Sequence, residues 1–165
     1  MEFRIEQRFD ASAADVEQAL LDPAFIEASA VLPKLGRSEL LSQTAAGPVV
    51  HTRIRYAFTG ELSGAVRRVV NPDRLTWIHD ATTDTATHHT TFEIVPDHYR
   101  ELLRATGTVD VTPAGDGCLR RAAGTVSVSV PLVGARVERA VVSGLEEHAA
   151  AERDLLARWL ADRAT

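Results

Sequence analysis

The segment from Cys118 to Leu145 reads CLRRAAGTVSVSVPLVGARVERAVVSGL and changes its hydrophobic period at Pro131. Before the proline, small or apolar residues alternate with polar ones, which is the period of a strand with one buried face. After it, apolar residues recur at helical spacing at Val133, Val137, Ala140, Val141, Gly144, Leu145, His148, Leu155 and Trp159. The segment therefore predicts a last strand followed by a helix over 133–162, about 45 Å long at 1.5 Å per residue.

The residues between Leu35 and this helix predict a meander of antiparallel strands. Alternating runs rich in Val and Thr are separated by turn signals such as Asn71-Pro72-Asp73 and Gly115-Asp116-Gly117. We expect strands near 37–44, 48–58, 65–70, 74–81, 86–95, 101–112 and 118–130.

The N-terminal residues predict one more strand and two short helices. In residues 2–9, charged residues alternate with a second set made of Phe3, Ile5, Gln7 and Phe9. Ser12 followed by Asp15 is typical of a helix start, and Asp22-Pro23 indicates a second start directly afterwards. The fold class is therefore α+β.

The composition fits one domain over residues 1–165, with 45% hydrophobic and 25% charged residues. The net charge is -5 and the arginines are scattered among acidic residues, which argues against nucleic acid as a partner. Residues 1–4 lack an apolar signal-peptide core, no run is long enough to cross a bilayer, and a single cysteine cannot form an intrachain disulfide. We expect a cytoplasmic protein that does not insert into membranes.

Three motifs carry a family resemblance: FDASAADV at 9–16, NPDRLTW at 71–77, and VPLVG at 130–134 with VER at 137–139. Together with the order of elements, they resemble the START and Bet v 1-like superfamily, also called SRPBCC or polyketide cyclase/dehydrase and lipid transport. The last motif is similar to an actinobacterial family of unknown function. The resemblance implies a helix-grip fold, in which a curved antiparallel sheet wraps a long C-terminal helix around a ligand cavity. Members include lipid carriers, cyclases and chaperone activators.

Alternation assigns a mostly small and apolar set of residues to the face of the sheet that meets the helix. The candidate ligand-binding residues on this face and on the helix are Tyr56, Trp77, Val109, Val126, Val141, Gly144 and His148. Small residues here fit either a cavity or close helix packing, and the aromatic residues and His148 fit either a ligand site or the ordinary core.

A hairpin around residues 82–85 would place His79 opposite His88. The pair would bind a polar ligand head at the cavity mouth, hold a metal with help from Asp80 or Asp84, or form a solvated hairpin end, which the sequence favours. A metal site is not expected, because the sequence offers no nearby third ligand of firm geometry. Inward-facing Arg68 or Arg120 could pair with a carboxylate such as Glu138 or with an acidic ligand head.

The sequence contains no nucleotide-binding or metalloprotease motif, so we expect no cofactor. The predicted function is binding or carriage of a small hydrophobic molecule, such as a lipid, isoprenoid or polyketide-like compound. One alternative is an aromatase/cyclase-type enzyme in which His148, or His79 with His88, moves protons. Another is a protein-interaction module with a filled core.

Overall fold

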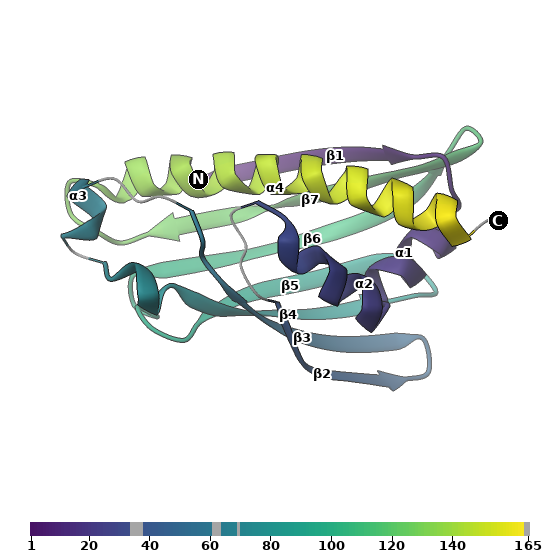
Figure 1. The fold of residues 1–165 in the computed structure, drawn as a ribbon, viewed down its shortest axis with the longest axis horizontal. Coiled ribbons are helices and arrows are strands. Elements are labelled where there is room, and N and C mark those ends of the chain that lie inside the picture. Colours follow the sequence, from purple (N-terminus) through teal and green to yellow (C-terminus); the bar gives the residue numbers. More distant parts are fainter. Residues whose placement is uncertain (34–37, 61–63, 69, 164–165) are drawn as a thin grey trace.

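A computed structural model describes residues 1–33, 38–60, 64–68 and 70–163. Seven antiparallel strands form one curved sheet in the order β1-β7-β6-β5-β4-β3-β2 (Figure 1). The strands are β1 (Glu2–Phe9), β2 (Glu39–Ala46), β3 (Val49–Ala57), β4 (Thr76–Asp84), β5 (His89–Pro96), β6 (Leu103–Ala114) and β7 (Gly117–Val128). The helices are α1 (Ala13–Leu21), α2 (Pro23–Ala28), α3 (Gly64–Arg67) and α4 (Gly134–Arg163), with short 3-10 turns at Ser29–Val31 and Pro72–Arg74. This is the predicted helix-grip fold.

The long helix α4 lies along one side of the sheet, over β1 and β7, and contacts α1 near its C-terminal end (Figure 1). Its 30 residues match the predicted helix within one residue at each end. The main core cluster lies around Leu156, which is fully buried with Phe9, Val16, Phe25 and other apolar residues of β1, α1, α2, β6 and β7. The C-terminal half of α4 is thus anchored by α1 and α2.

The two short helices begin at the predicted caps. The Ser12 hydroxyl accepts a hydrogen bond from the Asp15 backbone N–H at 3.1 Å, and the Asp22 carboxylate accepts one from Ala24 N–H at 2.9 Å. These bonds satisfy backbone donors that the first helical turn leaves unpaired. Both helix starts are therefore specified locally.

The strand predicted at 65–70 is wrong, because this stretch begins with the single helical turn α3. The reason is topological. β3 pairs directly with β4, and each of these strands already has a second neighbour, so the connection between them meets no free strand edge.

Strands β6 and β7 approach closely where Gly107 of β6 pairs with Gly124 of β7. A Cβ atom at Gly107 would lie 2.5 Å from the Ala123 carbonyl oxygen and 2.7 Å from the Phe92 ring. A Cβ at Gly124 would collide with the Thr106 carbonyl oxygen. The small size of these two residues therefore serves close approach of the backbones and not an open cavity.

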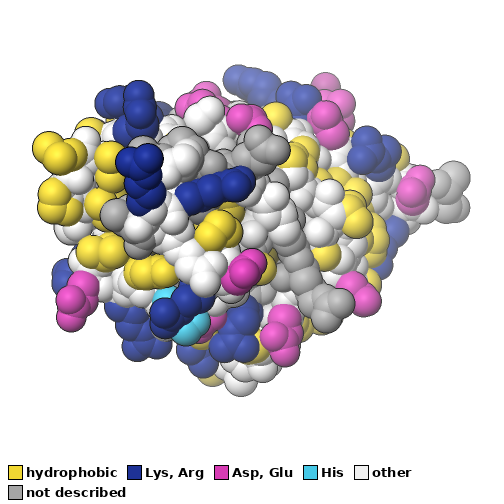
Figure 2. All heavy atoms as spheres, turned by 60° about the vertical axis from the view of Figure 1, so that its left-hand side comes forward, with side chains coloured by type: hydrophobic (Ala, Val, Ile, Leu, Met, Phe, Trp, Pro, Cys, Tyr) yellow, Lys and Arg dark blue, Asp and Glu magenta, His cyan; other side chains and the backbone are white. Residues whose placement is uncertain are grey.

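The described helices include none that is long and apolar enough to cross a membrane. Basic and acidic side chains are interspersed on the face at the α3 end of the molecule, with apolar side chains between them (Figure 2).

Candidate functional site

The candidate site lies on the inner face of the sheet, the face toward α4. The strand pairings place six residues on this face, which we use to define it: Gln7, Arg120, Val109, Phe92, His79 and Tyr56. Every second residue along each of these strands points to the same face, as period-two geometry requires.

Aromatic side chains form one side of the site. The rings of Tyr56 and Trp77 belong to directly paired residues and have centroids 6.2 Å apart. The imidazole of His79 lies 5.1 Å from the Phe92 ring, at an interplanar angle of 32°. These four residues are half-buried, so each side chain keeps some accessible surface. They form an aromatic wall over β3, β4 and β5.

A polar cluster ties the opposite side of the sheet to α4. Arg120 Nη1 donates hydrogen bonds to Gln7 Oε1 at 2.7 Å and to Glu152 Oε2 at 2.5 Å. Gln7 Nε2 donates to the Ala149 carbonyl oxygen at 2.6 Å. The exposed side-chain fractions are only 16% for Arg120 and 18% for Glu152, so the ion pair lies in the interior. A charged side chain that is largely buried needs an opposite charge and hydrogen bonds to offset its loss of hydration.

The electrostatics link this pair to the aromatic wall. Burial lowers the pKa of His79 to about 4, against a smaller raising effect of the Glu152 charge. Burial also raises the pKa of Tyr56, with Glu152 adding to the effect and Arg120 opposing it. The pKa of Glu152 is raised by burial, but the attraction of Arg120, His148 and His79 outweighs this and lowers it overall. At pH 7 the site therefore holds one ion pair, a neutral imidazole and a neutral phenol.

The polar atoms of Tyr56 and His79 are unpartnered and retain some accessible surface. Neither side chain forms a hydrogen bond within the described part of the chain. Among the described residues, the fully inaccessible side-chain N and O atoms that lack a partner are Arg120 Nε and Trp159 Nε1. The Tyr56 hydroxyl and the His79 nitrogens are therefore not fully closed off from solvent, although protein surrounds them closely enough to shift both pKa values.

The other predicted site residues lie in different surroundings. Val109, Val141 and Gly144 are half-buried, whereas Val126 has no exposed surface and belongs to the packed sheet. His148 Nδ1 lies 3.4 Å from the Pro33 carbonyl oxygen, at the margin between α4 and the segment after α2. His148 therefore contacts the chain that borders the site.

The predicted His79–His88 pair is wrong. The turn between β4 and β5 lies about three residues later than expected, so His79 pairs with Ile94. The Asp84 carboxylate accepts a hydrogen bond from Ala86 N–H at 2.9 Å and starts the turn there. His88 completes the turn with a φ of 55° and directs Nδ1 to Glu17 Oε1 of α1, 3.2 Å away.

Arg120 does face inward, but its predicted partner Glu138 does not reach it. Glu138 accepts a hydrogen bond from Val128 N–H at 2.9 Å and lies 3.5 Å from the N-terminal amino group. The other candidate, Arg68, is exposed.

Sequence reasoning missed Glu152 and Gln7 as members of the site. Both carried a signal, because each is a polar residue at a position where the hydrophobic period expects an apolar one.

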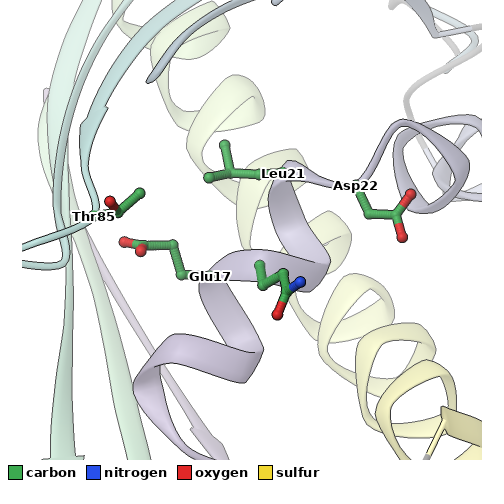
Figure 3. Close-up of a pocket in the computed structure, with 5 residues that line it drawn as sticks. Glu17, Leu21, Asp22 and Thr85 are labelled. Atoms are coloured by element: carbon green, nitrogen blue, oxygen red, sulfur yellow. The ribbon is translucent and has the colours of Figure 1, made fainter. Parts of the chain in front are cut away.

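A separate pocket of about 330 Å³ lies between α1 and the β4–β5 turn. Its lining residues are Glu17, Gln18, Leu21, Asp22 and Thr85. The Glu17 carboxylate and Thr85 face one another across it, whereas Asp22 points away (Figure 3). Its lining shares no residue with the predicted cavity. Among the described residues, no group of three or more His, Cys, Asp and Glu side chains could hold a metal ion.

Several solved structures share the fold. A norcoclaurine synthase mutant from Thalictrum flavum, in complex with a transition-state analogue, is 17% identical, with a TM-score of 0.69 over 100% of this chain and 96% of that one. An aromatase/cyclase from Streptomyces sp. R1128 is 11% identical, with a TM-score of 0.66 over 100% and 96%. A STAR-related lipid transfer protein from Xanthomonas axonopodis is 25% identical, with a TM-score of 0.65 over 94% and 85%.

No curated protein matches the sequence. One family model does, and it covers residues 4–160, which include all but the first two residues of β1, every other strand and nearly all of α4. The chain therefore belongs to the family described as protein of unknown function DUF2505.

Proposed function

We propose that this protein binds and carries a small hydrophobic molecule between the inner face of the sheet and α4. The observation that carries the proposal is the pair of unpartnered polar groups, Tyr56 and His79, which remain accessible within an aromatic interior. A buried polar group without a partner costs free energy unless a ligand or water satisfies it. The fold likeness to an aromatase/cyclase and a lipid transfer protein supports ligand binding in general terms.

The side chains around these groups suit an apolar ligand. Trp77 and Phe92 offer ring faces for stacking, and half-buried Val109 and Val141 add aliphatic surface from β6 and α4. Pockets of this kind combine mostly apolar walls with a few polar groups that orient the ligand.

We further propose, from the composition of the chain, that the protein acts in the cytoplasm.

A second candidate function is an enzyme of the aromatase/cyclase type. The observation in its favour is that the Glu152 charge is close enough to Tyr56 and to His79 to raise the pKa of each. A histidine with a pKa of about 4 is a weak base at pH 7, which favours binding over proton abstraction. The proposed proton transfer by a His79–His88 pair has no support, because the two residues are not paired.

Fluorescence titration with a neutral, planar 6-propionyl-2-dimethylaminonaphthalene probe tests the proposal. We expect saturable binding with a Kd of about 1 μM or below, about -8 kcal/mol. Val109→Phe should weaken it at least tenfold by occupying the interior, whereas Thr108→Phe on the opposite face of the same strand should not. The absence of saturable binding by the wild type would leave a protein-interaction module with a filled core.

Gly107, on the same face of β6 as Val109, is unsuitable for filling the interior because an added side chain collides with the backbone of β7. Native mass spectrometry of protein purified from its own host gives an independent readout, because a carrier retains its ligand as a reproducible added mass.

A further inference from the structure

We infer that the interior selects uncharged ligands whose polar group is a carbonyl or a hydroxyl, and discriminates against carboxylates. This inference rests on the proposed function and specifies its ligand class. It follows from the way charge is distributed among Arg120, Glu152, His79 and Tyr56.

The interior already contains a closed ion pair. The cation that a carboxylate ligand would seek, Arg120, donates through one nitrogen to both Gln7 and Glu152, and its Nε is inaccessible. A ligand carboxylate that approached Arg120 would also approach the Glu152 carboxylate, and repulsion would offset the attraction. The pair thus leaves no net positive charge to compensate burial of an anion.

The accessible polar groups are neutral. The Tyr56 hydroxyl can donate a hydrogen bond to a carbonyl oxygen, and a neutral imidazole at His79 can donate through one nitrogen and accept through the other. Both groups lack partners in the described part of the chain. They lie on neighbouring strands, beside the rings of Trp77 and Phe92. A flat ligand that carries a ketone or phenol therefore matches the site in both polarity and shape.

Other ionisable groups near the interior do not change this balance. His148 of α4 lies at the margin, beside the Pro33 carbonyl. Glu17 of α1 contacts His88 at the far end of the molecule, beside the separate pocket. Neither supplies a free cation to the aromatic wall.

The test compares two probes with the same dimethylaminonaphthalene ring, one with a 6-propionyl ketone and one with a 6-carboxylate. Wild-type protein at pH 7 should bind the ketone at least tenfold more tightly. Tyr56→Phe should weaken ketone binding about fivefold through the loss of one hydrogen bond. The matched control is Tyr99→Phe, since Tyr99 hydrogen-bonds the Asn71 backbone away from the site.

A charge variant sharpens the test. Glu152→Gln leaves Arg120 without a counter-charge, so the carboxylate probe should gain about tenfold relative to the ketone. Glu146→Gln is the control, because Glu146 is an exposed glutamate on the same helix. Near-UV circular dichroism establishes which variants fold, and the wild-type comparison stands even where Glu152→Gln does not.

The outcomes separate the two proposals. Equal or tighter binding of the carboxylate by the wild type would overturn the inference while leaving ligand binding intact. A folded Glu152→Gln protein with unchanged probe preference would overturn it as well. No saturable binding of either probe would overturn the proposed function itself.

Discussion

At the scale of single residues, the Arg120–Glu152 pair and its neighbour Gln7 are the polar groups that join three elements. Gln7 belongs to β1, Arg120 to β7 and Glu152 to α4, and the bonds among them are 2.5 and 2.7 Å long. Buried ion pairs add little net stability compared with apolar packing, because desolvation offsets the Coulomb attraction. Their hydrogen bonds are directional, however, and hold one turn of α4 against β1 and β7.

His79 makes the stability of the folded state depend on pH. Its folded pKa of about 4 lies below the ordinary value of 6.5, so between these pH values only the unfolded chain binds this proton. Unfolding is therefore favoured progressively as the pH falls from 7 to 4.5, by about 2 to 3 kcal/mol. His79→Gln should remove this part of the pH dependence, as urea unfolding across the range would measure.

The control is His98→Gln, because His98 is exposed and should leave the wild-type dependence unchanged. The stability that comes from the lowered pKa of Glu152 is also lost in acid, but only below the ordinary glutamate pKa of 4.5. This loss is the same in both variants. Identical pH profiles for wild type and His79→Gln would show that His79 is solvated.

At the scale of elements, α4 has two halves with different roles. Its C-terminal half packs into the core, where Leu156 has no exposed surface and Trp159 meets the Phe25 ring edge-on at 5.5 Å. Its N-terminal half lies over β1 and β7, with half-buried residues such as Val141. The C-terminal half stabilises the fold, and the N-terminal half borders the candidate site.

Leu156→Ala should lower the free energy of unfolding by about 3 kcal/mol, because it removes a fully buried side chain and leaves a cavity. Leu155 and Trp159 pack against the same cluster but are only partly buried, so Leu155→Ala should cost less. Leu132→Ala is the matched control, since Leu132 is fully exposed and the change should stay within about 0.5 kcal/mol. Urea midpoints that rank the three variants otherwise would contradict this orientation of α4.

At the scale of the whole molecule, the curl of the sheet creates the interior. β1 and β2 are its two edges, and α4 covers the β1–β7 side, so the aromatic wall on β3 to β5 faces inward from the other side. At Gly107 and Gly124 the neighbouring backbone lies so close that neither position can carry a side chain without a shift.

Gly107→Ala and Gly124→Ala should each destabilise the protein by about 1 to 3 kcal/mol, because overpacked positions force backbone displacement. Gly64→Ala is the control, since a Cβ atom there meets nothing within 4 Å. Thermal or urea unfolding would measure the difference. If Gly107→Ala were neutral, the backbone of β7 and the Phe92 ring could move aside at this point without cost.

The pattern of side chains along the chain was enough to predict most elements. Period two in residues 2–9, the change of period at Pro131, and the caps Ser12 and Asp22 all appear in the structure as expected, and the strand predicted at 118–130 appears as β7, Gly117–Val128. These features depend on neighbouring residues, whose spacing and hydrogen bonds act within one turn or one strand. Sequence therefore determined the fold class, the starts of α1 and α2, the bounds of α4 and the inward direction of Tyr56, His79 and Arg120.

The partners of those inward residues were decided by tertiary structure. The Asx turn at Asp84 sets the register that separates His79 from His88. When the turn between two strands lies later in the sequence, every residue of one strand pairs with a different residue of the other. Arg120 meets Glu152 instead of Glu138 because the packing of Leu156 against α1 and α2 sets which turn of α4 lies over β7. Local patterns specify which way a side chain points, whereas contacts between distant segments depend on how far each element slides along its neighbour.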